Sequence, residues 1–200
     1  MDTIVAKITN DSLTDKKIYE QAGKILREGG LVAFPTETVY GLGADALDEE
    51  ASAKIYAAKG RPSDNPLIVH IADIEALYKL SCEVPDKALK LADKFWPGPL
   101  TMILKKSDIV PDSITGGLGT VAIRMPSHKV AAELIRTSGV YIAAPSANTS
   151  GKPSPTRASH VIKDLSGKID MIIEDDTVDI GVESTIIDLS EEVPTILRPG

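Results

Sequence analysis

Residues 59–70 read KGRPSDNPLIVH, a cationic, proline-bracketed loop followed by an apolar run that ends in a histidine. Pro62 and Pro66 each fix the backbone φ angle, restrict the preceding residue and remove a hydrogen-bond donor. Folding alone does not require so stiff and polar a loop before a strand, so we expect it to bind a ligand. Lys59 and Arg61 indicate an anion. The alternative is that both cations complement the C-terminal dipole of the preceding helix.

The composition is that of a soluble globular chain with one domain. Its 200 residues are 42% hydrophobic and 26% charged, enough for one substantial core. The apolar runs are far shorter than the roughly 20 residues that span a bilayer, and the N-terminus has no signal-peptide pattern. The single cysteine, Cys82, argues against a disulfide framework and favours a cytoplasmic protein. A formal net charge of −7 argues against non-specific nucleic-acid binding as the main function.

Apolar residues recur at helix spacing and at strand spacing in alternating segments. A helix is predicted from Asp48, its N-cap, to Lys59, followed by a strand at 67–71. Residues 36–44 are predicted to be a loop with two glycines. Further strands are predicted at 3–8, 31–34, 101–104, 120–125, 140–144, 169–173, 184–189 and 195–197, and further helices at 15–28, after Asp73, from Pro85 to about Trp96, at 129–138 and at 156–165. The strand-rich last third favours a mixed α/β sheet over a purely parallel one.

Three polar loops adjoin predicted strands: TETVYGLG at 36–43, PSANTSGKPSPT at 145–156 and the start of GVESTIIDL at 181–189. Ligands of α/β sheets lie outside strand ends, where such loops converge. Neither a Walker loop nor G-x-G-x-x-G spacing is present. Cations and hydroxyls without an evident nucleophile favour catalysis by positioning and charge stabilisation, as in phosphoryl or nucleotidyl transfer. The residues expected to converge are Lys59, Arg61, Arg124, Arg198, Thr36, Thr38, Ser146, Ser154 and Ser184.

Each candidate also has a purely structural explanation. His70 at a strand end is, taken alone, more typical of a structural histidine, and His128 and His160 are predicted to be surface residues. Arg124 could be an exposed arginine at the end of its strand. The acidic residues at 174–176 could attract a metal ion, but a solvated turn is the simpler interpretation.

Seven runs together change this balance: FPTETVYGLGADA, KGRPSDNPLIVHI, FWPGPLT, VAIRMP, APSANTSGKPSPT, ESTIIDL and ILRPG. In this order they resemble the YrdC-like family of threonylcarbamoyl-AMP synthases, from about residue 15 to the last residue. The family's K-x-R signature corresponds to Lys59 and Arg61, and its S-x-N signature to Ser146 and Asn148. The resemblance implies an open, twisted, mixed parallel and antiparallel sheet flanked by helices, with a large concave cationic cavity. Residues 1–200 would form a single catalytic domain, either complete or the N-terminal part of a longer chain.

The resemblance also implies an activity. The enzyme would join L-threonine, bicarbonate or carbon dioxide, and ATP into L-threonylcarbamoyl-AMP and release pyrophosphate. A partner transferase complex would then modify the tRNA adenosine beside the anticodon, which makes a tRNA contact possible. Mg²⁺ would accompany ATP, held mainly by phosphates and water rather than by protein ligands. A non-catalytic RNA-binding module and a related carbamoyl-adenylate enzyme with another acceptor are the alternatives.

Site residues carried over from the family fall into three groups. The catalytic group comprises Lys59, Arg61, Ser146 and Asn148. The residues expected to bind ATP are Arg61, Asn65, Thr120, Ser146, Ser154 and Arg198. The residues expected to bind L-threonine are Thr38, His70, Arg124, Ala144 through its backbone, and Ser184. Of these, Arg124 would grip the threonine carboxylate in a bidentate fork.

Overall fold

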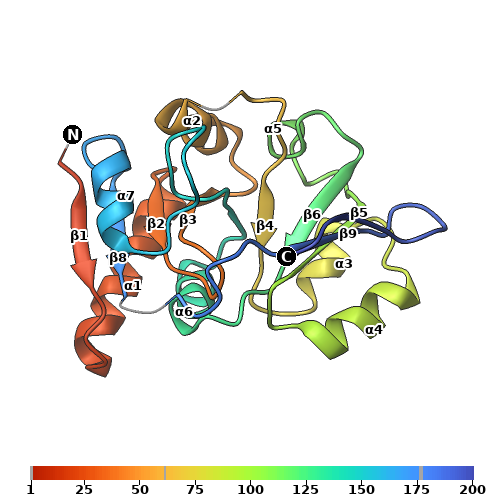
Figure 1. The fold of residues 1–200 in the computed structure, drawn as a ribbon, viewed down its shortest axis with the longest axis horizontal. Helices are drawn as coiled ribbons and strands as arrows, with labels where there is room; N and C mark the ends of the chain where they lie inside the picture. The colour runs from red at the N-terminus through yellow and green to blue at the C-terminus, as the bar shows by residue number, and fades with distance from the viewer. Residues whose placement is uncertain (1, 61, 176–177) are drawn as a thin grey trace.

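Ten strands form one mixed sheet in the computed structural model, which describes residues 2–60, 62–175 and 178–200 (Figure 1). The strands are β1 (Ile4–Lys7), β2 (Val32–Phe34), β3 (Gly41–Asp45), β4 (Ile68–His70), β5 (Leu100–Lys105), β6 (Thr120–Arg124), β7 (Ile142–Ala143), β8 (Met171–Glu174), β9 (Thr185–Asp188) and β10 (Thr195–Arg198). The helices are α1 (Ser12–Arg27), α2 (Glu49–Lys59), α3 (Ala76–Leu80), α4 (Asp86–Phe95), α5 (Asp112–Thr115), α6 (Lys129–Ser138) and α7 (Ala158–Leu165).

The order of strands across the sheet is β1-β8-β2-β3-β7-β4-β6-β5-β9-β10. The sheet contains parallel pairs, such as β4 with β6 and β5 with β9, and antiparallel pairs, such as β4 with β7 and β5 with β6. The predicted mixed sheet is therefore confirmed. Figure 1 shows β1 near one end of the molecule and β5 with β9 near the other.

Strand alternation divides the core between the two faces of the sheet. On β2, Val32 and Phe34 join the apolar cluster that contains residues of α1 and α6, whereas Ala33 joins the cluster that contains residues of α2, α3, α4, α5 and α7. Leu26 of α1 and Leu134 of α6 are fully buried in the first cluster. Helices consequently cover both faces, as the sequence predicts for an α/β sheet.

One predicted loop is a strand instead. Residues 41–45 form β3, which pairs with β2 on one side and with β7 on the other. A Cβ at Gly43 would lie 2.6 Å from Ile142 Cγ2 and 2.8 Å from Phe34 Cε1, so this position needs glycine for close packing. The prediction was wrong because glycine in a polar stretch is more typical of a turn, whereas here it allows two strands and an aromatic ring to approach.

Helix α2 leads directly into the segment 59–70 and sets its position. Asp48 caps its N-terminus by accepting from the backbone N–H groups of Glu50 and Ala51, as predicted. Gly60 ends the helix in the left-handed conformation, with φ of 61°. Lys59 is therefore in the last helical turn and Asn65 in the loop that leads to β4.

His128 is buried, which corrects its predicted surface position. Its Nδ1 accepts a hydrogen bond of 3.2 Å from the backbone N–H of Val130, so the imidazole acts as the N-cap of α6. No helix in the described part of the chain combines the length and the apolar character that crossing a bilayer requires.

Candidate active site

A cavity of about 350 Å³ lies over one face of the sheet between β4, β6, β5 and β9. It is a size that suits a small ligand. Its polar lining consists of Thr36, Thr38, Tyr40, Asn65, His70, Arg124, Ser146, Glu183, Ser184 and Arg198, and its apolar lining includes Ile68, Ile103, Ala122, Ala144, Ile186 and Leu197.

The floor of the cavity is built by strand alternation. Ile68 and His70 are two residues apart on β4, and Ala122 and Arg124 are two apart on β6, so each pair points to the same face. Because β4 and β6 are parallel, with His70 opposite Arg124, these two side chains lie at the same end of the cavity. The sequence predicted a site outside the strand ends, whereas the cavity also extends across a face of the sheet.

The loops enter from the other end. Strand β7 runs antiparallel to β4, so the loop that follows it, with Ser146, leaves the sheet at the end opposite His70. We call the end with His70 and Arg124 the inner end of the cavity and the opposite end the outer end. The loop at 36–40 also reaches the inner end, because Thr38 Oγ1 lies 3.0 Å from Nη1 of Arg124. Substrate groups from one end of the sheet to the other could thus be held in one cavity.

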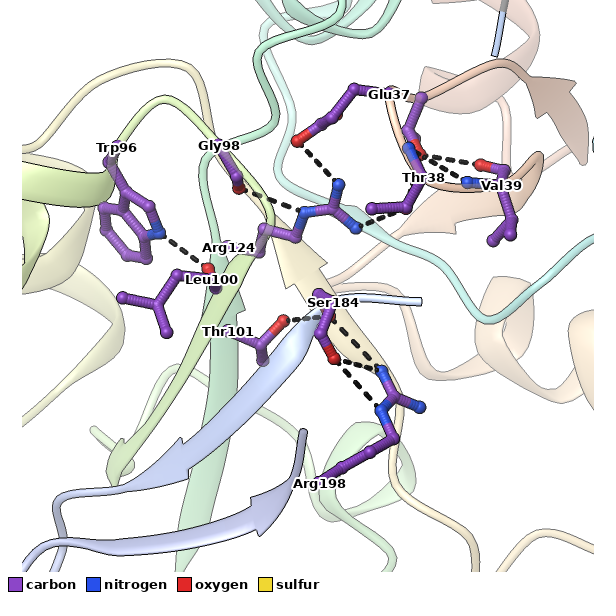
Figure 2. Close-up of polar contacts among 11 residues, drawn as sticks. Glu37, Thr38, Val39, Trp96, Gly98, Leu100, Thr101, Arg124, Ser184 and Arg198 are labelled. Atoms are coloured by element: carbon purple, nitrogen blue, oxygen red, sulfur yellow. Dashed lines mark hydrogen bonds and ion pairs between the residues drawn. The ribbon is translucent and has the colours of Figure 1, made fainter. Parts of the chain in front are cut away.

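Arg124 is buried, and its guanidinium contacts Glu37, Thr38 and the backbone carbonyl of Gly98 (Figure 2). Its Nη2 forms an ion pair of 2.7 Å with Oε1 of Glu37, its Nη1 donates to Thr38 Oγ1 at 3.0 Å, and its Nε donates to the carbonyl of Gly98 at 3.4 Å. Burial alone would raise the pKa of the Glu37 carboxyl, but the charge and hydrogen bond of Arg124 hold that pKa below its usual value. Glu37 is therefore an anion that neutralises the arginine, while Nη2 of Arg124 has no well-directed hydrogen-bond partner in the described part of the chain.

His70 is a neutral group at physiological pH. Burial first, and then the neighbouring charge of Arg124, lower the pKa of its imidazole to about 4. Nδ1 faces the carbonyl of Ile68 at 3.1 Å, and because a carbonyl can only accept, the ring proton belongs on Nδ1. The ring also packs edge-on against Phe34. This side chain can therefore position a substrate, and it carries no charge into the cavity.

The opposite wall contains a second arginine. Nε and Nη2 of Arg198 donate to the carbonyl oxygen of Ser184 at 3.0 and 2.9 Å, and the hydroxyls of Ser184 and Thr101 are 2.7 Å apart (Figure 2). Nη1 of Arg198 is 3.8 Å from Oε2 of Glu183, and both side chains are partly exposed. The hydroxyl of Ser154 donates to the other oxygen of Glu183 at 2.6 Å. Glu183 thus links two residues that were predicted to bind ATP.

Lys59 lies behind the cavity. It is only 2% exposed, and its Nζ donates to the backbone carbonyls of Ser146 and Asn148, the latter at 2.5 Å. Asn148 is also buried and donates from Nδ2 to the carbonyls of Thr149 and Lys152. Its Oδ1 is buried and has no hydrogen-bond partner within the described ranges. The two signatures therefore touch each other, with the lysine holding the backbone of the S-x-N loop.

The structure brings eight of the predicted site residues to one cavity. Lys59 and Asn148 lie behind it, whereas Ser154 contacts Glu183 and Thr120 begins β6, so none of these four lines it. Arg61 falls outside the described residues. The eight lining residues are Thr38, Asn65, His70, Arg124, Ala144, Ser146, Ser184 and Arg198.

Two carboxylates escaped the sequence analysis. Glu37 and Glu183 each pair with an arginine at the cavity and offset its charge. The predicted cationic character of the cavity therefore depends on Arg61, and it stays a prediction. For Glu37, its place in the sequence could have indicated a partner. It lies in a short segment between two buried strands, where a carboxylate needs a cationic neighbour. Glu183 directly precedes Ser184, but nothing in its neighbourhood indicates a partner 15 residues later.

Comparison with known proteins matches most of the chain to the family that the sequence motifs resemble. A Sua5/YciO/YrdC family model, described as telomere recombination, matches residues 24–200. Threonylcarbamoyl-AMP synthase from Pyrococcus abyssi is 59% identical over 99% of this chain and 58% of its own length, and that from Bacillus subtilis is 56% identical over 96% and 56%. A putative threonylcarbamoyl-AMP synthase from Mycobacterium tuberculosis is 38% identical over 88% and 80%. The chain thus spans little more than half the length of the first two relatives.

Solved structures agree with the fold. The structure of P. abyssi Sua5 complexed with L-threonine superposes with a TM-score of 0.94 at 56% identity, covering 100% of this chain and 58% of that chain. YciO from E. coli superposes with a TM-score of 0.83 at 25% identity, covering 100% and 96%. The open mixed sheet with flanking helices is therefore a shared architecture.

Proposed function

The chain belongs to the Sua5/YciO/YrdC family, and on that premise we propose that it catalyses formation of L-threonylcarbamoyl-AMP and pyrophosphate from L-threonine, bicarbonate or carbon dioxide, and ATP. The observation that carries the proposal is that eight residues predicted to bind the amino acid or ATP line one cavity. The names of the relatives and the L-threonine complex of one of them support it.

The reaction has two steps, and both need alignment of partly anionic species. The threonine amine adds to carbon dioxide and loses a proton, which gives a carbamate. A carbamate oxygen then attacks the α-phosphorus of ATP, and the bond to the β-phosphate oxygen breaks as pyrophosphate leaves. Holding these groups in line supplies most of the catalysis in such a mechanism. No residue needs to form a covalent intermediate.

The inner end of the cavity is assigned to L-threonine. Thr38, the neutral His70 and Ser184 offer hydrogen-bonding groups there, and Arg124 supplies a cation that Glu37 and Gly98 hold in place. Because Nη2 of Arg124 has no well-directed hydrogen-bond partner among the described residues, we propose that the threonine carboxylate binds the N–H groups that remain there.

ATP is assigned to the rest of the cavity, with Asn65 and Ser146 at the outer end, Arg198 on the wall beside Ser184, and Ser154 behind Glu183. Preorganised cations and dipoles are most effective where charge develops, here on the departing pyrophosphate. Arg61 is proposed for that task, and Lys59 contributes by holding the carbonyls of the S-x-N loop.

Mg²⁺ is proposed to enter as part of the ATP substrate. Among the described residues, no group of three or more His, Cys, Asp or Glu side chains could hold a metal ion. Phosphate oxygens and water are ligands that suit Mg²⁺, so the chain need only bind the phosphates. The remaining proposals are a cytoplasmic location, transfer of the product to tRNA by a partner enzyme, and contact with that tRNA.

The deciding experiment is incubation with ATP, bicarbonate and Mg²⁺, with and without L-threonine. The proposal requires pyrophosphate release only when threonine is present, and L-serine in place of threonine tests the acceptor. Arg61→Ala should abolish release while leaving circular dichroism and unfolding unchanged. Absence of threonine-dependent pyrophosphate, or equal release in the Arg61→Ala variant, would contradict the proposal. RNA binding without turnover would instead indicate a binding module.

A further inference from the structure

Thr36, Thr38 and Arg124 form a chain of hydrogen bonds along the cavity wall, and the direction of each bond follows from the chemistry of the groups at the two ends. At one end, Thr36 Oγ1 lies 2.6 Å from the carbonyl oxygen of Val39. A carbonyl has no hydrogen to give, so the single hydroxyl hydrogen of Thr36 is committed to that contact.

The next contact is thereby decided. The hydroxyls of Thr36 and Thr38 are 3.0 Å apart, and because Thr36 has no second hydrogen, Thr38 must be the donor. The hydroxyl of Thr38 makes the shortest of the contacts that Thr36 Oγ1 accepts, and the backbone N–H groups of Thr38 and Val39, at the longer distances of 3.2 and 3.3 Å, share the second lone pair of that oxygen.

At the other end the donor is fixed as well. An arginine can only donate, so Nη1 of Arg124 gives a hydrogen to Thr38 Oγ1. Thr38 therefore gives its hydrogen to Thr36, receives one from Arg124 and retains one lone pair. Thr38 lines the cavity, and a ligand group bonded to this hydroxyl meets a lone pair and not a hydrogen.

We propose that Thr36 is a positioning residue that fixes Thr38 as a hydrogen-bond acceptor, so that this wall selects a ligand group carrying N–H or O–H. The assignment of the ligand rests on the proposed function, in which L-threonine supplies two such groups, its amine and its hydroxyl. The carboxylate has no hydrogen at neutral pH, so it cannot donate to Thr38 and is left to the N–H groups of the neighbouring Arg124. The orientation of the amino acid is thereby restricted before any contact with ATP.

The first experiment does not depend on the proposed function. Neutron diffraction from perdeuterated protein without substrate locates hydroxyl deuterium atoms directly. The expected result is the deuterium of Thr36 directed at Val39 O and that of Thr38 directed at Thr36 Oγ1. A Thr38 deuterium directed into the cavity would overturn the inference, whatever the enzyme does.

The second experiment measures the effect on the ligand. Thr36→Val removes the hydroxyl at almost constant volume and frees the hydrogen of Thr38, and calorimetry should show L-threonine binding about tenfold weaker, the loss of roughly one hydrogen bond. Thr36→Ser keeps the hydroxyl and should restore most of the affinity. Thr115→Val is the matched control, because Thr115 is a buried threonine on α5 whose hydroxyl donates to Asp112 O at 3.4 Å, away from the cavity lining.

O-methyl-L-threonine separates the two donor groups of the substrate. If the substrate hydroxyl faces Thr38, the wild type should bind the methyl ether at least tenfold more weakly than L-threonine. In Thr36→Val the difference in affinity between the two ligands should then be smaller. If the amine faces Thr38, the affinity difference should not respond to Thr36→Val, and the tenfold loss of L-threonine affinity in that variant then carries the inference. Wild-type affinity for L-threonine in Thr36→Val, or equal losses in the Val and Ser variants, would overturn the inference. A wild type that binds no L-threonine would refute the proposed function, and the neutron result would still decide the hydrogen-bond chain.

Discussion

Two arginines face the same cavity, each beside a glutamate, and their surroundings differ. The side chains of Arg124 and Glu37 are 4% and 5% exposed and form an ion pair of 2.7 Å, whereas those of Arg198 and Glu183 are 38% and 44% exposed and 3.8 Å apart. Water screens the outer pair and not the inner one. The inner arginine is therefore part of the folded structure as well as the site, while the outer one can exchange its partner for a ligand.

Removing one member of the inner pair is the most direct test of whether that pair stabilises the fold. Arg124→Met leaves the Glu37 carboxylate buried without its cation, and the free energy of unfolding should fall by about 3–5 kcal/mol in urea titrations. The double variant Arg124→Met/Glu37→Leu should recover much of that loss, because no buried charge is left. A loss below about 1 kcal/mol in the single variant would show that the inner pair behaves like a surface pair.

Lys59 tests whether a second buried cation is also structural. Lys59→Met removes the donor from the carbonyls of Ser146 and Asn148, and stability should fall by about 1.5–3 kcal/mol, the usual range for hydrogen bonds to a charged group. The control is Lys54→Met on the same helix, an exposed lysine that donates to the carbonyl of Gly29 at 2.7 Å. Equal effects of the two variants would contradict a special role for Lys59.

The burial of His70, together with the charge of the inner arginine, should also appear in the pH dependence of stability. His70 has a folded pKa of about 4 against an ordinary value of 6.5, so the unfolded chain binds the proton more tightly between these values. Stability should therefore fall as pH drops from 6.5 to about 4, by at most about 1.4 kcal/mol per pH unit from this group, and level off below. Urea titrations of His70→Gln should show a shallower slope in that window than the wild type, and an unchanged slope would refute the neutral imidazole.

Glu37 contributes in a different pH window. Because Arg124 lowers the pKa of its carboxyl below the ordinary 4.5, its stabilisation is present above that pH and is lost only as pH falls further. The two groups can therefore be separated in one pH series.

The smallest effect on stability belongs to the outer arginine. Arg198→Met should lower the free energy of unfolding by about 1 kcal/mol, less than Lys59→Met does, because its ion pair is exposed and its hydrogen bonds to the carbonyl of Ser184 are only partly buried. Affinity for ATP, measured by calorimetry, should fall about tenfold if the guanidinium exchanges Glu183 for a phosphate. Unchanged ATP affinity would remove Arg198 from the nucleotide site, and a large loss of stability would remove the contrast with Arg124.

Local patterns in the sequence determined much of the secondary structure. The predicted helix 129–138 coincides with α6, and Asp48 caps α2 as expected, because spacing and capping depend on residues a few positions apart. Residues 41–45 were missed for the same reason, since the two strands that enclose Gly43 come from other parts of the chain. The candidate site residues were found through short motifs, and most of them do line one cavity.

The sequence by itself thus determined most of the helices and strands, and it indicated which side chains are expected to carry the chemistry. Only the tertiary structure decided how these side chains are paired: that Arg124 is engaged by Glu37, that Lys59 holds a loop from behind, and that Thr38 presents an acceptor. The physical reason is distance along the chain. Thr38 and Arg124 are 86 residues apart, and their contact depends on the strand order β7-β4-β6, which no local periodicity records.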